Sequence, residues 1–138
     1  MFRNPFSLRT LALSGVLLAP LWLGFSAHAS TPAEQLAGYT VQAGAAAQAA
    51  RGQTLFTNKH GKDWSCASCH TAIPTVAGKH ASTAKVIGAL APAFNPERFT
   101  DPAKTEKWFR RNCNDVMGRE CTAAEKADVL AWLISLKP

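Results

Sequence analysis

The segment Cys66-Ala67-Ser68-Cys69-His70 holds the residues whose types and spacing most directly indicate chemistry. Two cysteines two residues apart, followed at once by a histidine, form the pattern at which haem is attached covalently as a c-type cofactor. On one turn of chain the two thiols reach different vinyl groups of one porphyrin, and the next side chain presents an imidazole to the iron. The motif therefore predicts one haem c, bound through Cys66 and Cys69, with His70 as the proximal iron ligand through its Nε2 atom.

Two other kinds of site use closely spaced cysteines. A structural zinc site normally needs a second short-spaced Cys/His pair, but the other two cysteines, Cys113 and Cys121, lie eight positions apart. A thioredoxin-like redox pair lies in a βαβ setting, and no strand pattern surrounds this motif. The haem interpretation is therefore favoured over both.

The N-terminal segment has the three parts of an export signal. Arg3 and Arg9 precede an apolar run over residues 11–25, and Ala27-His28-Ala29 matches a cleavage site. The run is short for a membrane span and is interrupted by glycine and proline. We expect residues 1–29 to be a cleaved signal peptide and residues 30–138 to be a single haem domain in the periplasm, with no membrane span in the mature protein.

The charge of the chain is moderately basic. Fifteen Lys and Arg residues stand against nine Asp and Glu residues, for a formal net charge of +6 at pH 7. The basic residues are scattered and are not interleaved with stacking aromatics, so nucleic-acid binding has no support. A plain solvated surface explains them, and weak electrostatic docking to a redox partner is the functional alternative.

The first half of the mature chain shows only one clear helix. We expect residues 30–40 to be loosely ordered, and the Ala-rich run over residues 42–50 to start a helix that continues through Gly52 and Phe56. After the haem motif, residues 75–96 are rich in Gly, Ala, Ser and Pro, which predicts a loop over the haem edge.

Two helix starts are predicted in the second half. Asp101 followed by Pro102 indicates an N-cap and first helical residue, with the helix running toward Asn112. Thr122 with Glu125 three residues later matches a capping box. The last helix then has one apolar face, which we expect to pack on Gly52 and Phe56 and which comprises Val129, Trp132, Leu133 and Leu136.

These elements predict an all-α protein. A helix before CxxCH, a long loop and a terminal helix resemble the small class I cytochrome c fold, in which N- and C-terminal helices pack around a covalently attached haem.

The remaining cysteines point to a disulfide. In an oxidising compartment, with the other pair attached to haem, Cys113 and Cys121 are expected to bond to each other, with free thiols or intermolecular pairing as the alternatives. The segment between them contains Met117, the one methionine of the mature chain.

The stretch from Arg111 to Cys121, after Arg98-Phe99-Thr100-Asp101, resembles the sphaeroides haem protein (SHP) family of monohaem class I cytochromes. In that family an asparagine beside a disulfide-bonded cysteine is the sixth iron ligand, and the resemblance implies that Asn112 has this role. The related cytochrome c″ proteins carry histidine there. Asn114 would be the ligand instead if the register of the resemblance were shifted by two residues. Only one of the two can face the iron, since on a helix their side chains point about 200° apart. Without the resemblance, Asn112 would be read as capping its own helix.

The identity of the sixth ligand decides the function. A releasable asparagine predicts an iron that binds O2, NO or CO after reduction by a partner cytochrome, which the resemblance implies to be a dihaem cytochrome c. Turnover of the bound gas would make the protein a terminal oxidase or reductase, and the sequence does not separate this from simple binding. The alternative is a plain electron carrier with a permanent sixth ligand from Met117, His60 or His80. A peroxidase would need acid–base groups from these histidines or from Arg110 and Arg111, for which there is no specific evidence.

Overall fold

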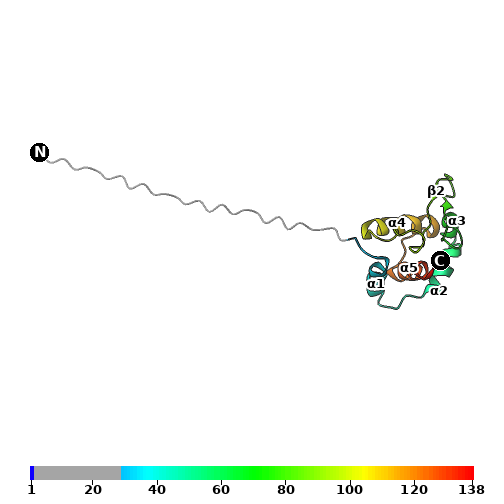
Figure 1. The fold of residues 1–138 in the computed structure, drawn as a ribbon, viewed down its shortest axis with the longest axis horizontal. Helices are drawn as coiled ribbons and strands as arrows, with labels where there is room; N and C mark the ends of the chain where they lie inside the picture. The colour runs from blue at the N-terminus through cyan, green and yellow to red at the C-terminus, as the bar shows by residue number, and fades with distance from the viewer. Residues whose placement is uncertain (2–28) are drawn as a thin grey trace.

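The computed structural model describes Met1 and residues 29–138, so the expected signal peptide lies almost wholly outside the described residues (Figure 1). Helices dominate the described part: α1 (Pro32–Ala43), α2 (Ala49–Thr57), α3 (Ala67–His70), α4 (Pro102–Met117) and α5 (Ala123–Ser135). The two strands, β1 (Gly78–Lys79) and β2 (Val86–Ile87), form an antiparallel hairpin in which Gly78 pairs with Ile87. Among residues 29–138, no helix has the length and apolar character needed to cross a membrane.

The expectation that residues 30–40 are loosely ordered is wrong, because they form most of α1. Thr31 is the N-cap: its hydroxyl accepts a hydrogen bond from the Glu34 backbone N–H at 3.2 Å, and its own N–H donates to the Glu34 carboxylate at 2.7 Å. Pro32 supplies a φ angle already suited to the first helical turn. The buried Tyr39 then packs α1 against α5.

The helix expected from residue 42 onward is interrupted. The chain leaves α1 at Gly44, which adopts φ +62° and donates its N–H to the Val41 carbonyl. This left-handed conformation costs glycine little and ends the helix, so the alanine run is divided between two elements. The second part of the expectation holds, because α2 contains Gly52 and Phe56.

The contact between α2 and α5 forms as expected. Phe56 lies against Trp132 with ring centroids 4.9 Å apart, and both belong to a buried cluster with Val129 and Leu133. A Cβ atom on Gly52 would lie 2.0 Å from the Asp128 carbonyl oxygen. Glycine at this position therefore allows the two helix backbones to approach closely.

The predicted starts of α4 and α5 are both confirmed. The Asp101 carboxylate accepts a hydrogen bond from the Lys104 N–H at 3.0 Å, and Thr122 and Glu125 form the expected capping box. Helix α4 continues beyond Asn112 and ends at Gly118, which adopts φ +72°.

Helix α4 lies above α1, α2 and α5 in Figure 1, and its backbone makes few close approaches to the other described helices. Phe109 packs against both buried clusters, and Glu106 pairs with Lys126 of α5 at 2.7 Å. Close backbone approaches are concentrated instead where α5 meets α1 and α2. Side-chain contacts therefore hold α4 against the rest of the fold. Few direct contacts fix its position relative to α3.

Candidate haem-binding site

The turn that carries the CxxCH motif is short and regular. Helix α3 starts after Cys66, whose carbonyl accepts hydrogen bonds from the Cys69 N–H at 3.2 Å and the His70 N–H at 3.1 Å. Neither cysteine takes part in a disulfide. One turn therefore presents two thiols and an imidazole together, as the spacing predicts.

His70 is a neutral, incompletely satisfied group. Its Nδ1 atom is buried and makes no hydrogen bond within the described part of the chain. Burial, helped by the positive charge of Arg98, lowers the pKa of His70 to about 4. The Phe56 ring lies beside it, with centroids 6.2 Å apart. The nitrogen predicted to bind iron is the other one, Nε2, and a buried, neutral imidazole can serve as such a ligand.

The environment of Cys66 argues against a redox-active thiol. Burial raises its pKa to about 11. Reactive cysteines in thioredoxin-like sites have a lowered pKa, because the thiolate is the nucleophile. The pair is thus better suited to covalent attachment than to thiol exchange.

The β1–β2 hairpin packs directly on the motif. A Cβ atom on Gly78 would lie 2.0 Å from the Cys69 carbonyl oxygen, and the Ala81 N–H donates to the Cys69 sulfur at 3.3 Å. Sequence reasoning assigned this stretch to a loop and missed the contact, since a single glycine was its only signal.

Arg98 holds the loop that follows the β1–β2 hairpin. Its guanidinium donates to the carbonyl oxygens of Gly88 at 2.8 Å and Ala89 at 2.9 Å. The N–H groups of Leu90 and Ala91 both donate to the Pro74 carbonyl at 3.0 Å. The chain that follows the haem motif is therefore tied to the loop that precedes α4, a role that no sequence pattern indicated.

Helix α4 gives the two asparagines different environments. Asn114 is exposed, and its side-chain amide donates to the Arg110 carbonyl at 2.7 Å. Asn112 is half-buried beside the buried Cys113, and its side chain makes no hydrogen bond to any residue that the structure describes. Both asparagines lie inside α4, whose C-cap is Gly118, so Asn112 does not cap its own helix.

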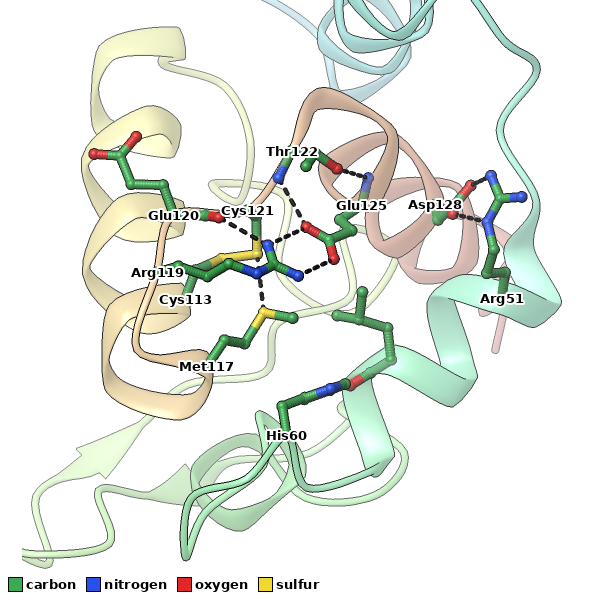
Figure 2. A network of polar contacts seen from close by, with 11 residues as sticks. Arg51, His60, Cys113, Met117, Arg119, Glu120, Cys121, Thr122, Glu125 and Asp128 are labelled. Atoms are coloured by element: carbon green, nitrogen blue, oxygen red, sulfur yellow. Dashed lines mark hydrogen bonds and ion pairs between the residues drawn. A yellow bond between two sulfur atoms is a disulfide. The ribbon is translucent and has the colours of Figure 1, made fainter.

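A disulfide joins Cys113 to Cys121, with Cα atoms 5.6 Å apart, as expected. It connects α4, one residue beyond Asn112, to the segment that starts α5. Figure 2 shows this bond beside an ion pair between Arg119 and Glu125 and the capping residue Thr122. The residue after Asn112 is thus fixed covalently to the helical core.

Two of the three alternative sixth ligands, His60 and His80, use one ring nitrogen in a hydrogen bond, and Met117 makes a sulfur–sulfur contact. The Met117 sulfur lies 3.6 Å from the Cys121 sulfur (Figure 2). His60 Nε2 donates to the Leu55 carbonyl at 2.7 Å, and His80 Nδ1 accepts from the Thr83 N–H at 3.4 Å. Of the arginines considered for a peroxidase, Arg111 stacks over the Trp108 ring, 5.6 Å from its centroid.

The residues around the motif fit a haem. Several large apolar side chains on the segments flanking the motif and on α4 are substantially exposed, including Trp64 at 39%, Ile73 at 59% and Trp108 at 43%. Exposed apolar surface of this kind is normally covered by a ligand or partner. Two free thiols, an unpartnered buried imidazole and an apolar surround are the groups that a covalently attached porphyrin requires.

The chain resembles several known proteins. Residues 42–133 match the domain of unknown function DUF1924. The cytochrome c-type protein SHP of Cereibacter sphaeroides is 50% identical over 129 residues, which cover 91% of this chain and 96% of that protein. Cytochrome c″ of Methylophilus methylotrophus is 45% identical over 80 residues, covering 58% of this chain and 56% of that protein.

Solved structures agree with these sequence matches. The structure of oxidised SHP, described as an oxygen-binding cytochrome c, superposes with a TM-score of 0.73 at 48% identity, covering 78% of this chain and 99% of that one. Oxidised cytochrome c″ from Methylophilus methylotrophus gives a TM-score of 0.72 at 36% identity, covering 78% and 95%. The predicted all-α cytochrome fold is thereby confirmed.

Proposed function

This chain belongs to the same family as the cytochrome c-type protein SHP, and from that premise we propose that it binds a diatomic gas at its haem iron, opposite His70, at a position that Asn112 occupies until reduction. The family confirms the resemblance found in the sequence and makes the chain a c-type cytochrome with covalently bound haem c. The observation that supports the gas-binding proposal most directly is the half-buried Asn112 side chain, which makes no hydrogen bond within the described part of the chain.

The cofactor is held by residues of α3 and its N-cap. Cys66 and Cys69 would form the thioether bonds, and His70 would bind the iron through Nε2. When bound, haem supplies an iron that changes between ferric and ferrous states and can bind O2, NO or CO. Burial keeps the His70 imidazole neutral and therefore able to coordinate.

Asn112 acts as a ligand whose strength depends on the oxidation state. Its amide oxygen is a hard, neutral donor, which suits ferric iron better than the softer ferrous ion. Asn112 would therefore bind ferrous iron less strongly, and its NH2 group could then donate a hydrogen bond to a bound gas molecule. The disulfide at Cys113 keeps the α4 backbone in place while the side chain moves.

The cellular setting follows from the export signal. Residues 1–29 are removed as a signal peptide, and residues 30–138 form the mature haem domain in the periplasm. A partner cytochrome, of the dihaem c type implied by the resemblance, supplies the electron. The moderate surplus of basic residues favours a weak, salt-sensitive encounter with that partner.

The test is an anaerobic absorption spectrum of the holo-protein, first oxidised, then reduced with dithionite and finally exposed to CO. A high-spin ferrous spectrum that shifts with CO is expected. Asn112→Ala should change the ferric spectrum, whereas the matched change Asn114→Ala should leave it as in the unmodified protein. A low-spin ferrous spectrum that ignores CO would contradict gas binding and indicate an electron carrier with Met117, His60 or His80 as permanent ligand.

A further inference from the structure

The C-terminal end of α4 lacks a positive charge of its own. The helix has no basic residue in its last turn, while Asp115 adds a negative charge there. Because the unpaired carbonyls at a helix C-terminus carry partial negative charge, an acid there is unfavourable and a cation is stabilising. The helix therefore needs a cation from elsewhere in the chain.

Lys62 supplies it from the loop between α2 and α3. Its Nζ donates to the Asn114 carbonyl at 3.2 Å, and the same carbonyl accepts the Gly118 N–H at 3.1 Å. The Lys62 side chain passes close to Gly118, since a Cβ atom on that glycine would lie 3.3 Å from Lys62 Cε. Glycine at the end of α4 thus provides the space in which the lysine reaches the helix terminus.

This bond connects the two sides of the haem site. Lys62 lies four residues before Cys66, and its acceptor lies two residues after Asn112. A cavity of about 450 Å³, lined by Gly61, Lys62, Asp63, Trp64 and Asp115, lies beside the bond. The loop and the end of α4 are therefore joined across open space by one polar contact, and not through a packed interface.

The other nearby attachment of α4 is of a different kind. The Cys113–Cys121 disulfide fixes the helix to the start of α5 and does not break thermally. The Lys62 contact is exposed, so salt weakens it and the loop can release it. Asn112 is thus followed within two residues by a permanent attachment at Cys113 and a reversible one at Asn114.

We propose that Lys62 is a positioning residue for the distal ligand: by holding the end of α4 to the loop that leads into Cys66, it slows the departure of Asn112 from the iron. This inference rests on the proposed function, because it takes Asn112 as the distal ligand. Lys62 itself does not touch the iron or the gas.

The experiment measures how fast imidazole binds to the ferric holo-protein. At saturating imidazole the observed rate reaches a limit set by dissociation of the native sixth ligand. Lys62→Met keeps most of the aliphatic stem and removes the charge, and it should raise that limit about two- to fivefold. Lys62→Arg should restore the original limit, because a guanidinium can donate to the same carbonyl.

Two controls separate positioning from general effects of charge. Lys59→Met removes an exposed lysine of the same loop that makes no hydrogen bond within the described residues, and it should leave the limit unchanged. High salt should raise the limit for the unmodified protein but not for Lys62→Met. A Lys62→Met protein with the original limiting rate, or one no different from Lys59→Met, overturns the proposal.

Asn112→Ala distinguishes this failure from failure of the proposed function. If Asn112 is the ligand, the Asn112→Ala protein should bind imidazole without a rate limit. A limit unchanged by Asn112→Ala would show that another residue is the ligand, and would overturn both proposals. A limit abolished by Asn112→Ala but unaffected by Lys62→Met would overturn only the role of Lys62.

Discussion

At the scale of single residues, Glu125 performs two tasks beside the disulfide. Its carboxylate receives two hydrogen bonds from Arg119, at 2.6 and 2.8 Å, and one from the Thr122 backbone N–H at 2.8 Å (Figure 2). Its own N–H donates to the Thr122 hydroxyl at 3.2 Å. One side chain therefore caps α5 and also fixes the segment that carries Cys121.

This arrangement predicts a dependence of stability on pH. The Arg119 bonds, with help from Thr122, lower the pKa of Glu125 from 4.5 to about 2. A lowered folded-state pKa means that the ionised carboxylate stabilises the fold above the unfolded-state pKa, and that this contribution is lost as the pH falls through the folded-state value. The unmodified protein should therefore be more stable than Glu125→Gln above pH 4.5, and the difference should shrink toward pH 2.

Urea unfolding of both proteins at a series of pH values checks this prediction. Glutamine still fits the capping box, so the variant isolates the charge. Glu120→Gln, at an exposed neighbouring acid, is the matched control and should show no such dependence. A difference between Glu125→Gln and the unmodified protein that stays constant from neutral pH to pH 2 would argue against the ion pair.

Part of the haem site could be predicted from single residues. The spacing of the CxxCH motif predicts the roles of Cys66, Cys69 and His70, because covalent attachment of haem requires that spacing. The choice between Asn112 and Asn114 could not be made by spacing alone, since both lie on one helix and only the rotation of that helix separates them. We propose Asn112 in preference to Asn114 because the Asn114 side chain already bonds to the Arg110 carbonyl. Lys62 and Arg98 were not foreseen, because a lysine or arginine that binds a distant carbonyl leaves no local pattern.

At the scale of elements, the capping signals were the most informative part of the sequence. Asp101 with Pro102, and Thr122 with Glu125, correctly located the starts of α4 and α5. The same signature occurs at Thr31 with Glu34, where it was overlooked and a helix was missed. The alanine run predicted one continuous helix where the structure has two. Helix propensity is weak evidence beside a glycine that ends a helix at φ +62°.

The packing of α2 on α5 gives a second prediction. Gly52→Ala would place a Cβ atom 2.0 Å from the Asp128 carbonyl oxygen, a backbone atom that cannot move without shifting α5. We expect a loss of about 3 kcal/mol in the free energy of unfolding, as for severe overpacking. Gly38→Ala is the control, because a Cβ atom there meets nothing within 4 Å and lies inside α1. It should raise stability by about 0.5–1 kcal/mol, because alanine favours helix.

Chemical denaturation of the three holo-proteins measures both effects. Equal stabilities for Gly52→Ala and the unmodified protein would mean that α2 and α5 are not as close as the structure places them.

The disulfide gives a third prediction, the second at the scale of elements. Replacing both Cys113 and Cys121 with alanine removes the covalent attachment of α4 to α5 beside Asn112. The closed loop is short, so the cost in stability should be near the low end of about 2–4 kcal/mol. Because the backbone next to Asn112 also becomes freer, the ferric spin state should shift toward high spin.

Calorimetry and the ferric absorption spectrum measure the two effects separately. Selective reduction of the bridge in the unmodified protein should reproduce the spectral change, and the same treatment should not alter the double variant. A stability loss with an unchanged spectrum would assign the bridge a purely structural role.

At the scale of the whole molecule, the haem is part of the fold as well as the site. The direct packing between helices is concentrated where α5 meets α1 and α2, while the backbones of α3 and α4 make few close approaches to each other. His70 Nδ1 is buried without a protein partner in the described chain, and large apolar residues around the motif are exposed. A small chain of this kind buries too little apolar surface alone, and the porphyrin supplies the missing contact.

The final prediction concerns the protein without its cofactor. Cys66→Ala/Cys69→Ala removes both attachment points and, purified free of haem, should keep the α1–α2–α5 contact while losing fixed packing around α3 and α4. We expect lower helicity and a broad thermal transition by circular dichroism, where the holo-protein should unfold sharply. Hydrogen exchange should locate the loss: amides of α4 should exchange much faster than in the holo-protein, while those of α5 change less. Helix α5 contributes Leu130 and Leu133 to two separate buried clusters, which it forms with α1 and with α2. A haem-free protein with a sharp transition and protected α4 amides would show that α4 is held by the polypeptide alone, and that its separation from α3 does not depend on the porphyrin.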